Sequence, residues 1–346
     1  MVILEQLPGA ILPWYEENKR ELPWRQDKAP YHIWLSEIML QQTRVEAVKG
    51  YYARFLQRLP DIASLAACDD EVLHKLWEGL GYYSRVRNLK KAAIEIMSTY
   101  GGEFPREYDR ILALPGIGAY TAGAISSIAF GQPTPAVDGN VLRVLSRLRA
   151  DGECVDLPTH KKRISRELEQ IYPRDAAGAF TQALMELGAT VCLPNGAPKC
   201  ESCPCRDFCK SRAGDWKLYP VRQEKKKRRI EEKTVFILRC ADVWALVKRP
   251  EKGLLAGLWQ FPDTPGFLDA EAAMAWLEER GIHPVNPERM VERNHIFTHI
   301  EWKMRGWYIA VADMNEEFIW MDRAQVEQNA ALPTAYRQFW EEKRDV

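Results

Sequence analysis

The sequence lacks most of the features that mark membrane, secreted or fibrous proteins. It contains no apolar run of roughly eighteen residues, no internal repeat and no low-complexity segment. The opening MVILEQLPGAILPWYEENKR has no basic start followed by an apolar stretch and a small-residue cleavage site, which is the pattern of a secretory signal. We therefore expect a cytoplasmic protein with no membrane partner.

Net charge is also absent, because 48 Lys and Arg balance 48 Asp and Glu. The balance hides an asymmetry. Residues 1–230 hold 34 basic against 28 acidic side chains (+6), and residues 231–346 hold 14 against 20 (−6). A polyanion would approach the first part rather than the second. An excess of six charges is too small to establish nucleic-acid binding without motifs.

The chain has 346 residues, a length that suits two domains. Helical spacing without strand alternation predicts an all-α domain over residues 1–212, with helices near 31–59, 71–100 (broken near Gly79–Gly81), 106–130, 141–150 and 160–172. A polar segment, 213–232, reads as a linker. Strand patterns at 234–240, 243–249 and 299–313 and helices near 269–281 and toward the C-terminus predict a smaller α+β domain over 233–346.

Five of the eight cysteines lie within residues 192–209. A reducing cytoplasm disfavours disulfides, so this cluster favours a metal site. Seven, two and five residues separate Cys192, Cys200, Cys203 and Cys209, and Cys205 lies inside the last interval. Four thiolates can hold either a tetrahedral zinc or a 4Fe–4S cluster. The single CxxC favours the cluster slightly, but spacing alone does not separate the two.

The segment LPGIG, Leu114–Gly118, joins two expected helices. Its glycines permit tight turns, and the next helix begins with free backbone N–H groups. Such amides bind a phosphate without reading base sequence. An ordinary helical hairpin would show the same pattern, so LPGIG alone leaves both interpretations open.

Two acidic residues, Asp138 and Glu37, have sequence neighbours that suit a role in charge stabilisation or proton transfer. Asp138 precedes Gly139 and Asn140 at the expected N-cap of the helix from Val141, where capping is its simplest role. Glu37, in WLSEIMLQQT, has apolar neighbours that should raise its pKa and let it carry a proton near neutral pH. A salt-bridged helical glutamate is the structural alternative.

Together these motifs resemble the endonuclease III superfamily of helix–hairpin–helix DNA glycosylases, and SEIMLQQT resembles its MutY-type adenine DNA glycosylases. The family's Cys–x6–Cys–x2–Cys–x5–Cys loop carries a 4Fe–4S cluster. This chain departs by one residue, because its first gap is seven. The resemblance implies four cluster ligands and leaves Cys205 as a non-ligand; the ligands are Cys192, Cys200, Cys203 and Cys209.

The resemblance also implies catalytic roles. Glu37 would protonate the adenine, and Asp138 would stabilise the sugar cation. Lyase members carry a lysine where this chain has Tyr120, and a phenol cannot form their Schiff base. The enzyme is therefore expected to be monofunctional, with the Tyr120 hydroxyl bonding Asp138 or a sugar-bound intermediate. LPGIG resembles the family hairpin, whose DNA contacts fall on Leu114, Gly116 and Gly118.

Further matches imply base-reading residues. Gln42 and Tyr82 correspond to residues that wedge into the duplex, Gln182 to one that contacts the flipped adenine, and Arg25 to a phosphate or base contact. Residues 233–346 resemble the Nudix-related domain of the family. The helix AMAWLEERG lacks the full acidic set of a Nudix hydrolase, so nucleotide hydrolysis is not expected. A Phe-Ser-His loop that inspects 8-oxoguanine corresponds here to Phe297, Thr298 and His299, which on pattern alone merely end a strand.

The expected function is removal of adenine paired with 8-oxoguanine or guanine in double-stranded DNA, as part of base excision repair. We expect a monomer, located in the cytoplasm and associated with the nucleoid if the source is bacterial. Two alternatives remain. One is a bifunctional glycosylase and lyase for oxidised pyrimidines, and the other is a non-catalytic DNA-binding protein with a zinc knuckle.

Overall fold

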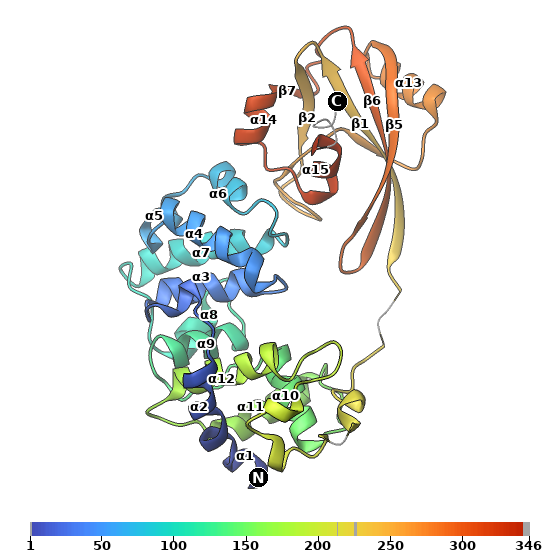
Figure 1. The fold of residues 1–346 in the computed structure, drawn as a ribbon. Coiled ribbons are helices and arrows are strands. Elements are labelled where there is room, and N and C mark those ends of the chain that lie inside the picture. Colours follow the sequence, from blue (N-terminus) through green and yellow to red (C-terminus); the bar gives the residue numbers. More distant parts are fainter. Residues whose placement is uncertain (1, 213, 225–226, 342–346) are drawn as a thin grey trace. The chain divides into compact units, whose positions relative to one another are not determined.

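A computed structural model describes residues 2–212, 214–224 and 227–341 (Figure 1). Residues 213, 225 and 226 of the expected linker, and 342–346 at the C-terminus, lie outside it. Within the described ranges, no helix combines the length and the apolar character needed to cross a bilayer. The chain forms two compact units. Unit one comprises residues 1–67 and 87–224, and unit two comprises 68–86 and 225–346.

Unit one is helical throughout, as the sequence predicts (Figure 1). The expected helix over 31–59 is interrupted at Gln41–Arg44, where Gln42 adopts a positive φ of 58°. The helices of unit one, with α7 continuing from unit two, are α1 (Val2–Glu5), α2 (Leu7–Asn18), α3 (Pro30–Leu40), α4 (Val45–Arg58), α5 (Ile62–Ala67), α7 (Ser84–Thr99), α8 (Tyr108–Ala113), α9 (Ala119–Ile128), α10 (Gly139–Arg149), α11 (Pro158–Glu169) and α12 (Ala177–Thr190). Short 3-10 turns are η1 (Pro23–Arg25), η2 (Cys200–Ser202), η3 (Arg206–Phe208) and η4 (Asp215–Leu218).

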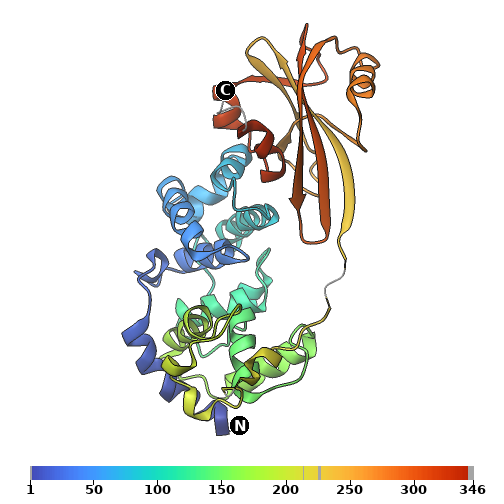
Figure 2. The same ribbon diagram turned by 45° about the vertical axis from the view of Figure 1, so that its right-hand side comes forward.

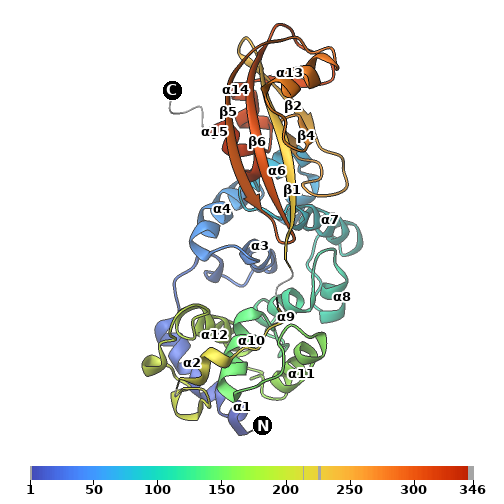
Figure 3. The same cartoon turned by 90° about the vertical axis from the view of Figure 1, so that its right-hand side faces the viewer.

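The core of unit one holds α9, α10 and α12 close together (Figure 3). Apolar side chains of α2, α10 and α12 form one buried cluster, with Leu145 and Leu184 almost fully enclosed. A Cβ on Gly188 of α12 would lie 2.6 Å from the Cβ of Asn140, so α12 can approach the start of α10 only because this residue is glycine. This packing fixes the N-terminal end of α10, which carries Asp138.

Unit two is built on a mixed sheet with the strand order β3-β2-β1-β6-β5, in which β4 pairs with β1 and β7 pairs with β2. β1 runs parallel to β6, and β5 and β6 form a long antiparallel hairpin (Figure 2). Apolar clusters cover the two faces of the sheet. The strands are β1 (Arg229–Cys240), β2 (Val243–Lys248), β3 (Trp259–Gln260), β4 (Asp263–Pro265), β5 (Pro284–Ile296), β6 (Ile300–Val311) and β7 (Ile319–Asp322). The helices are α13 (Ala270–Glu278), α14 (Arg323–Asn329) and α15 (Thr334–Glu341).

Unit two also contains α6 (Asp70–Leu76), from the N-terminal half of the sequence. Glu71 on α6 accepts hydrogen bonds from Lys248 and, at 2.9 Å, from the indole of Trp259. Glu78 forms an ion pair with Arg337 at 2.6 Å. Polar contacts of this kind depend on the positions of single side chains, which a pattern of apolar residues does not predict. They join residues 68–86 to the C-terminal part of the chain, so the compact units do not coincide with the two halves of the sequence.

Candidate active site

Glu37, Tyr120 and Asp138 line a single hollow of about 700 Å³ in unit one. They come from α3, α9 and the residue that precedes α10, so three separate elements bring them together. A larger hollow of about 1060 Å³ lies in the same unit, but it is lined by none of these three residues. The smaller hollow is therefore the candidate active site.

Glu37 is buried, with 6% of its surface exposed. Burial raises the pKa of its carboxyl group to about 7, and the nearby charge of Asp138 adds to the rise. A hydrogen bond from Tyr120 and the positive charge of Arg25 oppose it. The apolar neighbours in the sequence predict this direction. At neutral pH the group therefore exists in both protonated and ionised forms, which suits an acid that later acts as a base.

Asp138 caps α10, as its position in the sequence predicts. Its Oδ1 accepts the backbone N–H of Val141 at 2.7 Å, and its Oδ2 accepts the side-chain amide of Asn140 at 2.7 Å. Burial raises the pKa of Asp138, while these two donors and the charge of Arg143 favour the carboxylate. Arg143 also donates to the Asn140 amide oxygen at 2.9 Å, so Asn140 is held with its NH₂ group toward Asp138. Nothing in the sequence pattern singled out Asn140.

The hydroxyl of Tyr120 donates a hydrogen bond to Oε2 of Glu37. The sequence suggested Asp138 or a sugar-bound intermediate as its partner, so the observed partner is a different carboxylate. Burial, together with the charges of Glu37 and Asp138, raises the pKa of Tyr120 well above its usual value. The phenol therefore stays protonated and remains a donor.

A buried ion-pair group completes the wall of the hollow. Glu186 on α12 has a fully buried side chain and accepts from Arg20 at 2.6 Å and from Arg25 at 2.7 Å. Arg25, Gln42 and Gln182 line the same hollow. Glu186 was not predicted from the sequence. Glu186 is a lone acidic residue within the apolar helix that also contains Gln182, and this feature of the sequence could have indicated a buried, paired carboxylate.

The Leu114–Gly118 hairpin joins α8 to α9. Gly116 adopts a positive φ of 76°, and a Cβ there would lie 2.5 Å from the Cβ of Asn88, so the fold itself requires glycine. Gly118 is the N-cap of α9 with φ −99°, and a Cβ there would meet nothing within 4 Å. Leu114 is buried and anchors the turn. A side chain at position 118 would therefore contact none of the described residues.

Tyr82 and Thr298, far apart in sequence, meet within unit two. Their hydroxyl oxygens lie 3.1 Å apart, at hydrogen-bond distance. Tyr82 is 47% exposed and adopts a positive φ of 47°. Phe297 packs edge-on against Trp302 with ring centroids 4.8 Å apart, whereas His299 is exposed. Phe297–His299 form the turn between β5 and β6, so they connect two strands and also present two polar side chains outward.

The cysteine loop follows α12 and packs on the core of unit one. Cys205 is buried at 2% exposure, and the other four loop cysteines are half-buried. Burial raises the pKa of the Cys192 thiol, and Arg147, which donates to its Sγ at 3.4 Å, opposes that rise. Among the described residues, no three cysteine sulfurs lie within 4.8 Å of one another. Tetrahedral zinc, with Zn–S of about 2.3 Å, would place them about 3.8 Å apart.

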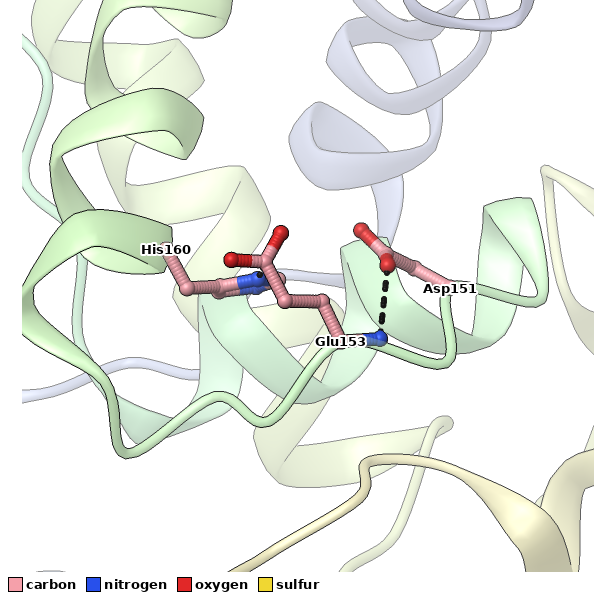
Figure 4. Close-up of side chains that lie close together, drawn as sticks. All are labelled: Asp151, Glu153 and His160. Atoms are coloured by element: carbon pink, nitrogen blue, oxygen red, sulfur yellow. Dashed lines mark hydrogen bonds and ion pairs between the residues drawn. The ribbon is translucent and has the colours of Figure 1, made fainter.

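A second group of potential metal ligands consists of Asp151, Glu153 and His160 (Figure 4). Its centre is already occupied by a cation, because one nitrogen of Arg163 lies 2.6 Å from Asp151 and 2.9 Å from Glu153. The same nitrogen lies 3.1 Å from Nδ1 of His160. The guanidinium takes the place of a metal ion, and this group is structural.

Comparison with known proteins gives matches to both parts of the chain. Residues 35–174 match the HhH-GPD superfamily of base excision DNA repair proteins, and residues 234–342 match the NUDIX domain. An adenine DNA glycosylase of Rattus norvegicus is 33% identical over 97% of this chain and 74% of its own length. One from Buchnera aphidicola (Acyrthosiphon pisum) is 36% identical over 84% of this chain and 82% of its own.

Solved structures resemble the helical part. A thermostable thymine-DNA glycosylase is 30% identical, with a TM-score of 0.57 over 61% of this chain and 97% of its own. Endonuclease III in a non-covalent DNA complex is 24% identical, with a TM-score of 0.52 over 62% of this chain and 98% of its own. The second likeness shows a shared fold.

Proposed function

This chain belongs to the adenine DNA glycosylases of base excision repair, and from that premise we propose that it hydrolyses the N-glycosidic bond of adenine mispaired with 8-oxoguanine or guanine. Its membership in a family of DNA N-glycosylases makes it an enzyme and makes DNA its partner. The mispair, the catalytic residues and the absence of lyase activity are the proposed parts.

The single observation that carries the proposal is the hollow shared by Glu37 and Asp138. One carboxyl group there has a pKa raised to about 7, and the other is held by two hydrogen-bond donors. Two carboxyl groups with different environments are the usual means of dividing acid and charge-stabilising roles. A flipped nucleoside between them would meet both.

In the proposed reaction, protonated Glu37 gives its proton to N7 of the adenine. The glycosidic bond then breaks, and its electron pair leaves with the base. General acid catalysis of this kind typically contributes about 10²–10⁴-fold. Asp138 stabilises the positive charge on the sugar, and ionised Glu37 takes a proton from the attacking water. Tyr120 assists by holding Glu37 in place, and with no amine at this position the product is an intact strand with an abasic site.

Base recognition is assigned by the family resemblance to residues of both units. Gln42 and Tyr82, both exposed, would enter the duplex beside the lesion and offset the cost of extrusion, roughly a few kcal/mol. Thr298 would contact the 8-oxoguanine in the company of Phe297 and His299. Its present hydrogen bond to Tyr82 makes these two residues neighbours before DNA binds.

The remaining contacts position the DNA. Gln182 and Arg25 would face the flipped adenine, since both line the hollow. The hairpin residues Leu114, Gly116 and Gly118 would bring the first N–H groups of α9 to a backbone phosphate. The free space beside the Cα of Gly118 supports this assignment, because none of the described residues would lie within 4 Å of a Cβ there.

We further propose that four cysteines hold a 4Fe–4S cluster: Cys192, Cys200, Cys203 and Cys209. No three of the described cysteine sulfurs lie within 4.8 Å of one another, which supports the wider ligand spacing of a four-iron cluster over tetrahedral zinc. Arg147 beside Cys192 would stabilise the thiolates. When bound, such a cluster would tie the loop together and can exchange electrons. A monomeric, cytoplasmic enzyme remains the proposed form.

The test uses four duplexes that place adenine opposite 8-oxoguanine, guanine or thymine, or that contain thymine glycol. Each is incubated with enzyme and then divided between alkali and buffer. Adenine release from the first two duplexes alone, with strand breaks only after alkali, is the expected result. Glu37→Gln should abolish release, and the matched control Glu46→Gln, a 79% exposed side chain on α4, should not. Normal release by Glu37→Gln would refute the acid assignment.

A bifunctional glycosylase and lyase is the second candidate. The helical fold that this chain shares with endonuclease III keeps it in consideration. Strand cleavage without alkali, or release of thymine glycol, would favour it over the monofunctional proposal.

A further inference from the structure

The segment 219–223, within the expected linker, is fastened to unit one beside the active-site hollow. The backbone oxygen of Tyr219 accepts a hydrogen bond from Arg147 at 3.0 Å, and that of Val221 accepts from the N–H of Val155 at 3.0 Å. The N–H of Gln223 donates to Oδ2 of Asp156 at 3.0 Å. A segment held at three points presents its side chains in a defined direction.

Two cations with unused binding capacity lie on the wall of this hollow. Arg222 from the fastened segment and Lys161 from α11 both line the hollow that contains Glu37 and Asp138. Arg222 bonds Oδ1 of Asp156 at 3.1 Å through one nitrogen, and its side chain is 52% exposed. A guanidinium has five N–H donors, so most of them remain available. Exposed Lys161 has no side-chain partner among the described residues.

The other cations of the hollow are already engaged. Arg20 and Arg25 share Glu186, and Arg143 is bonded to Asn140 and to the backbone oxygens of Gly188 and Cys192. Lys161 and Arg222 are therefore the cations of this wall best able to accept a new anion. Arg222 is paired with Asp156 through one nitrogen, and about half of its side chain remains exposed.

We propose that Arg222 and Lys161 form a phosphate clamp, which binds the DNA backbone on the strand whose adenine enters the hollow. Base extrusion turns a nucleotide about its backbone, so the flanking phosphodiesters are drawn to the mouth of the pocket. Each phosphodiester carries a negative charge, and a cation can neutralise it there without recognising the base sequence. This clamp rests on the proposed function and extends it, because it makes the start of the linker part of the substrate site.

Salt dependence of DNA binding tests the clamp. Arg222→Ala, Lys161→Ala and the double variant are compared with wild type on a duplex with a non-hydrolysable abasic analogue opposite 8-oxoguanine. Each lost phosphate contact should lower the slope of log K against log salt by about 0.9, and the double variant by about 1.8. Lys162→Ala, an exposed neighbour on α11 that does not line the hollow, is the matched control and should leave the slope unchanged.

Two further arms separate charge from folding. Asp156→Asn breaks the ion pair but keeps the arginine, so the slope of log K against log salt should match that of wild type. Arg222→Lys keeps the positive charge, so it should retain most of the wild-type slope. Unchanged slopes in both alanine variants would overturn the clamp, as would an equal loss in Lys162→Ala. Wild-type enzyme that fails to release adenine from the mispair would instead defeat the proposed function, whatever the slopes are.

Discussion

The hydroxyl of Tyr120 on α9 donates a hydrogen bond to the carboxyl group of Glu37 on α3. The two residues are 83 positions apart and line the same hollow, where Glu37 is buried and Tyr120 is half-buried. The bond favours the ionised form of Glu37, whereas burial favours the neutral form. Tyr120 thus lowers the pH range in which Glu37 can give a proton, and this effect can be measured.

Tyr120→Phe should move the pH profile of adenine release to higher pH. Without the donor, the pKa of Glu37 rises above its present value of about 7, so the protonated acid persists further into the alkaline range. Single-turnover rates across the neutral to alkaline range measure the shift of the falling limb. A limb that stays in place, or moves to lower pH, would show that Tyr120 does not act through Glu37.

Glu37→Gln should make stability less dependent on pH. Glu37 titrates at about 7 in the folded chain and near 4.5 when unfolded, so its raised pKa gives stability that is full below 4.5 and lost as the pH rises through 7. The wild type should lose about 3 kcal/mol from this one group over that range. Chemical denaturation at acidic and mildly alkaline pH measures the difference. The variant should be the more stable protein at alkaline pH, and equal losses in both proteins would contradict the buried-acid assignment.

The sequence predicted those features of the site that depend on neighbouring residues. The cap made by Asp138 needs only the next three residues, and the burial of Glu37 follows from apolar neighbours on its own helix. The pairing of Tyr120 with Glu37 depends on how α3 packs against α9, which no local pattern reports. Arg20 and Arg25 converge on Glu186 for the same reason.

The fold shows the same division between local and long-range signals. Strands β1 and β2 were predicted because each is an apolar run beside a short turn, and they pair as an antiparallel hairpin. The thirteen-residue strand β5, Pro284–Ile296, was not predicted, because it is an edge strand with half-buried and exposed residues in alternation and two prolines. The place of α6 in unit two rests on ion pairs such as that of Glu71 with Lys248, which hydrophobic periodicity cannot reveal.

Asp138→Asn should separate the charge of this residue from its capping role. Asparagine can still cap α10 through its amide oxygen, but its NH₂ group would face the NH₂ of Asn140, so the variant should lose about 1 kcal/mol of stability together with adenine release. Asp138→Ala removes both acceptors, so it should lose release and about 2 kcal/mol of stability. Denaturation curves and single-turnover assays on both variants make the comparison. An active Asp138→Asn enzyme would show that the position serves structure alone.

The cysteine assignment predicts opposite outcomes for two thiols that are separated by a single residue. Cys203→Ser removes a proposed ligand and should lose the bound iron, the acid-labile sulfide and the visible absorbance of the purified protein. Cys205→Ala removes a buried thiol that packs in the core of unit one, so it should keep iron and sulfide at the wild-type ratio and lose about 1 kcal/mol of stability. Analysis of bound iron and sulfide in the two variants and the wild type tests the assignment.

Because both changes fall in the same loop, general damage to the loop would affect the two variants alike. Only a true ligand at position 203 would make them differ. Iron lost in Cys205→Ala but kept in Cys203→Ser would exchange the two roles, and zinc in place of iron in the wild type would refute the cluster.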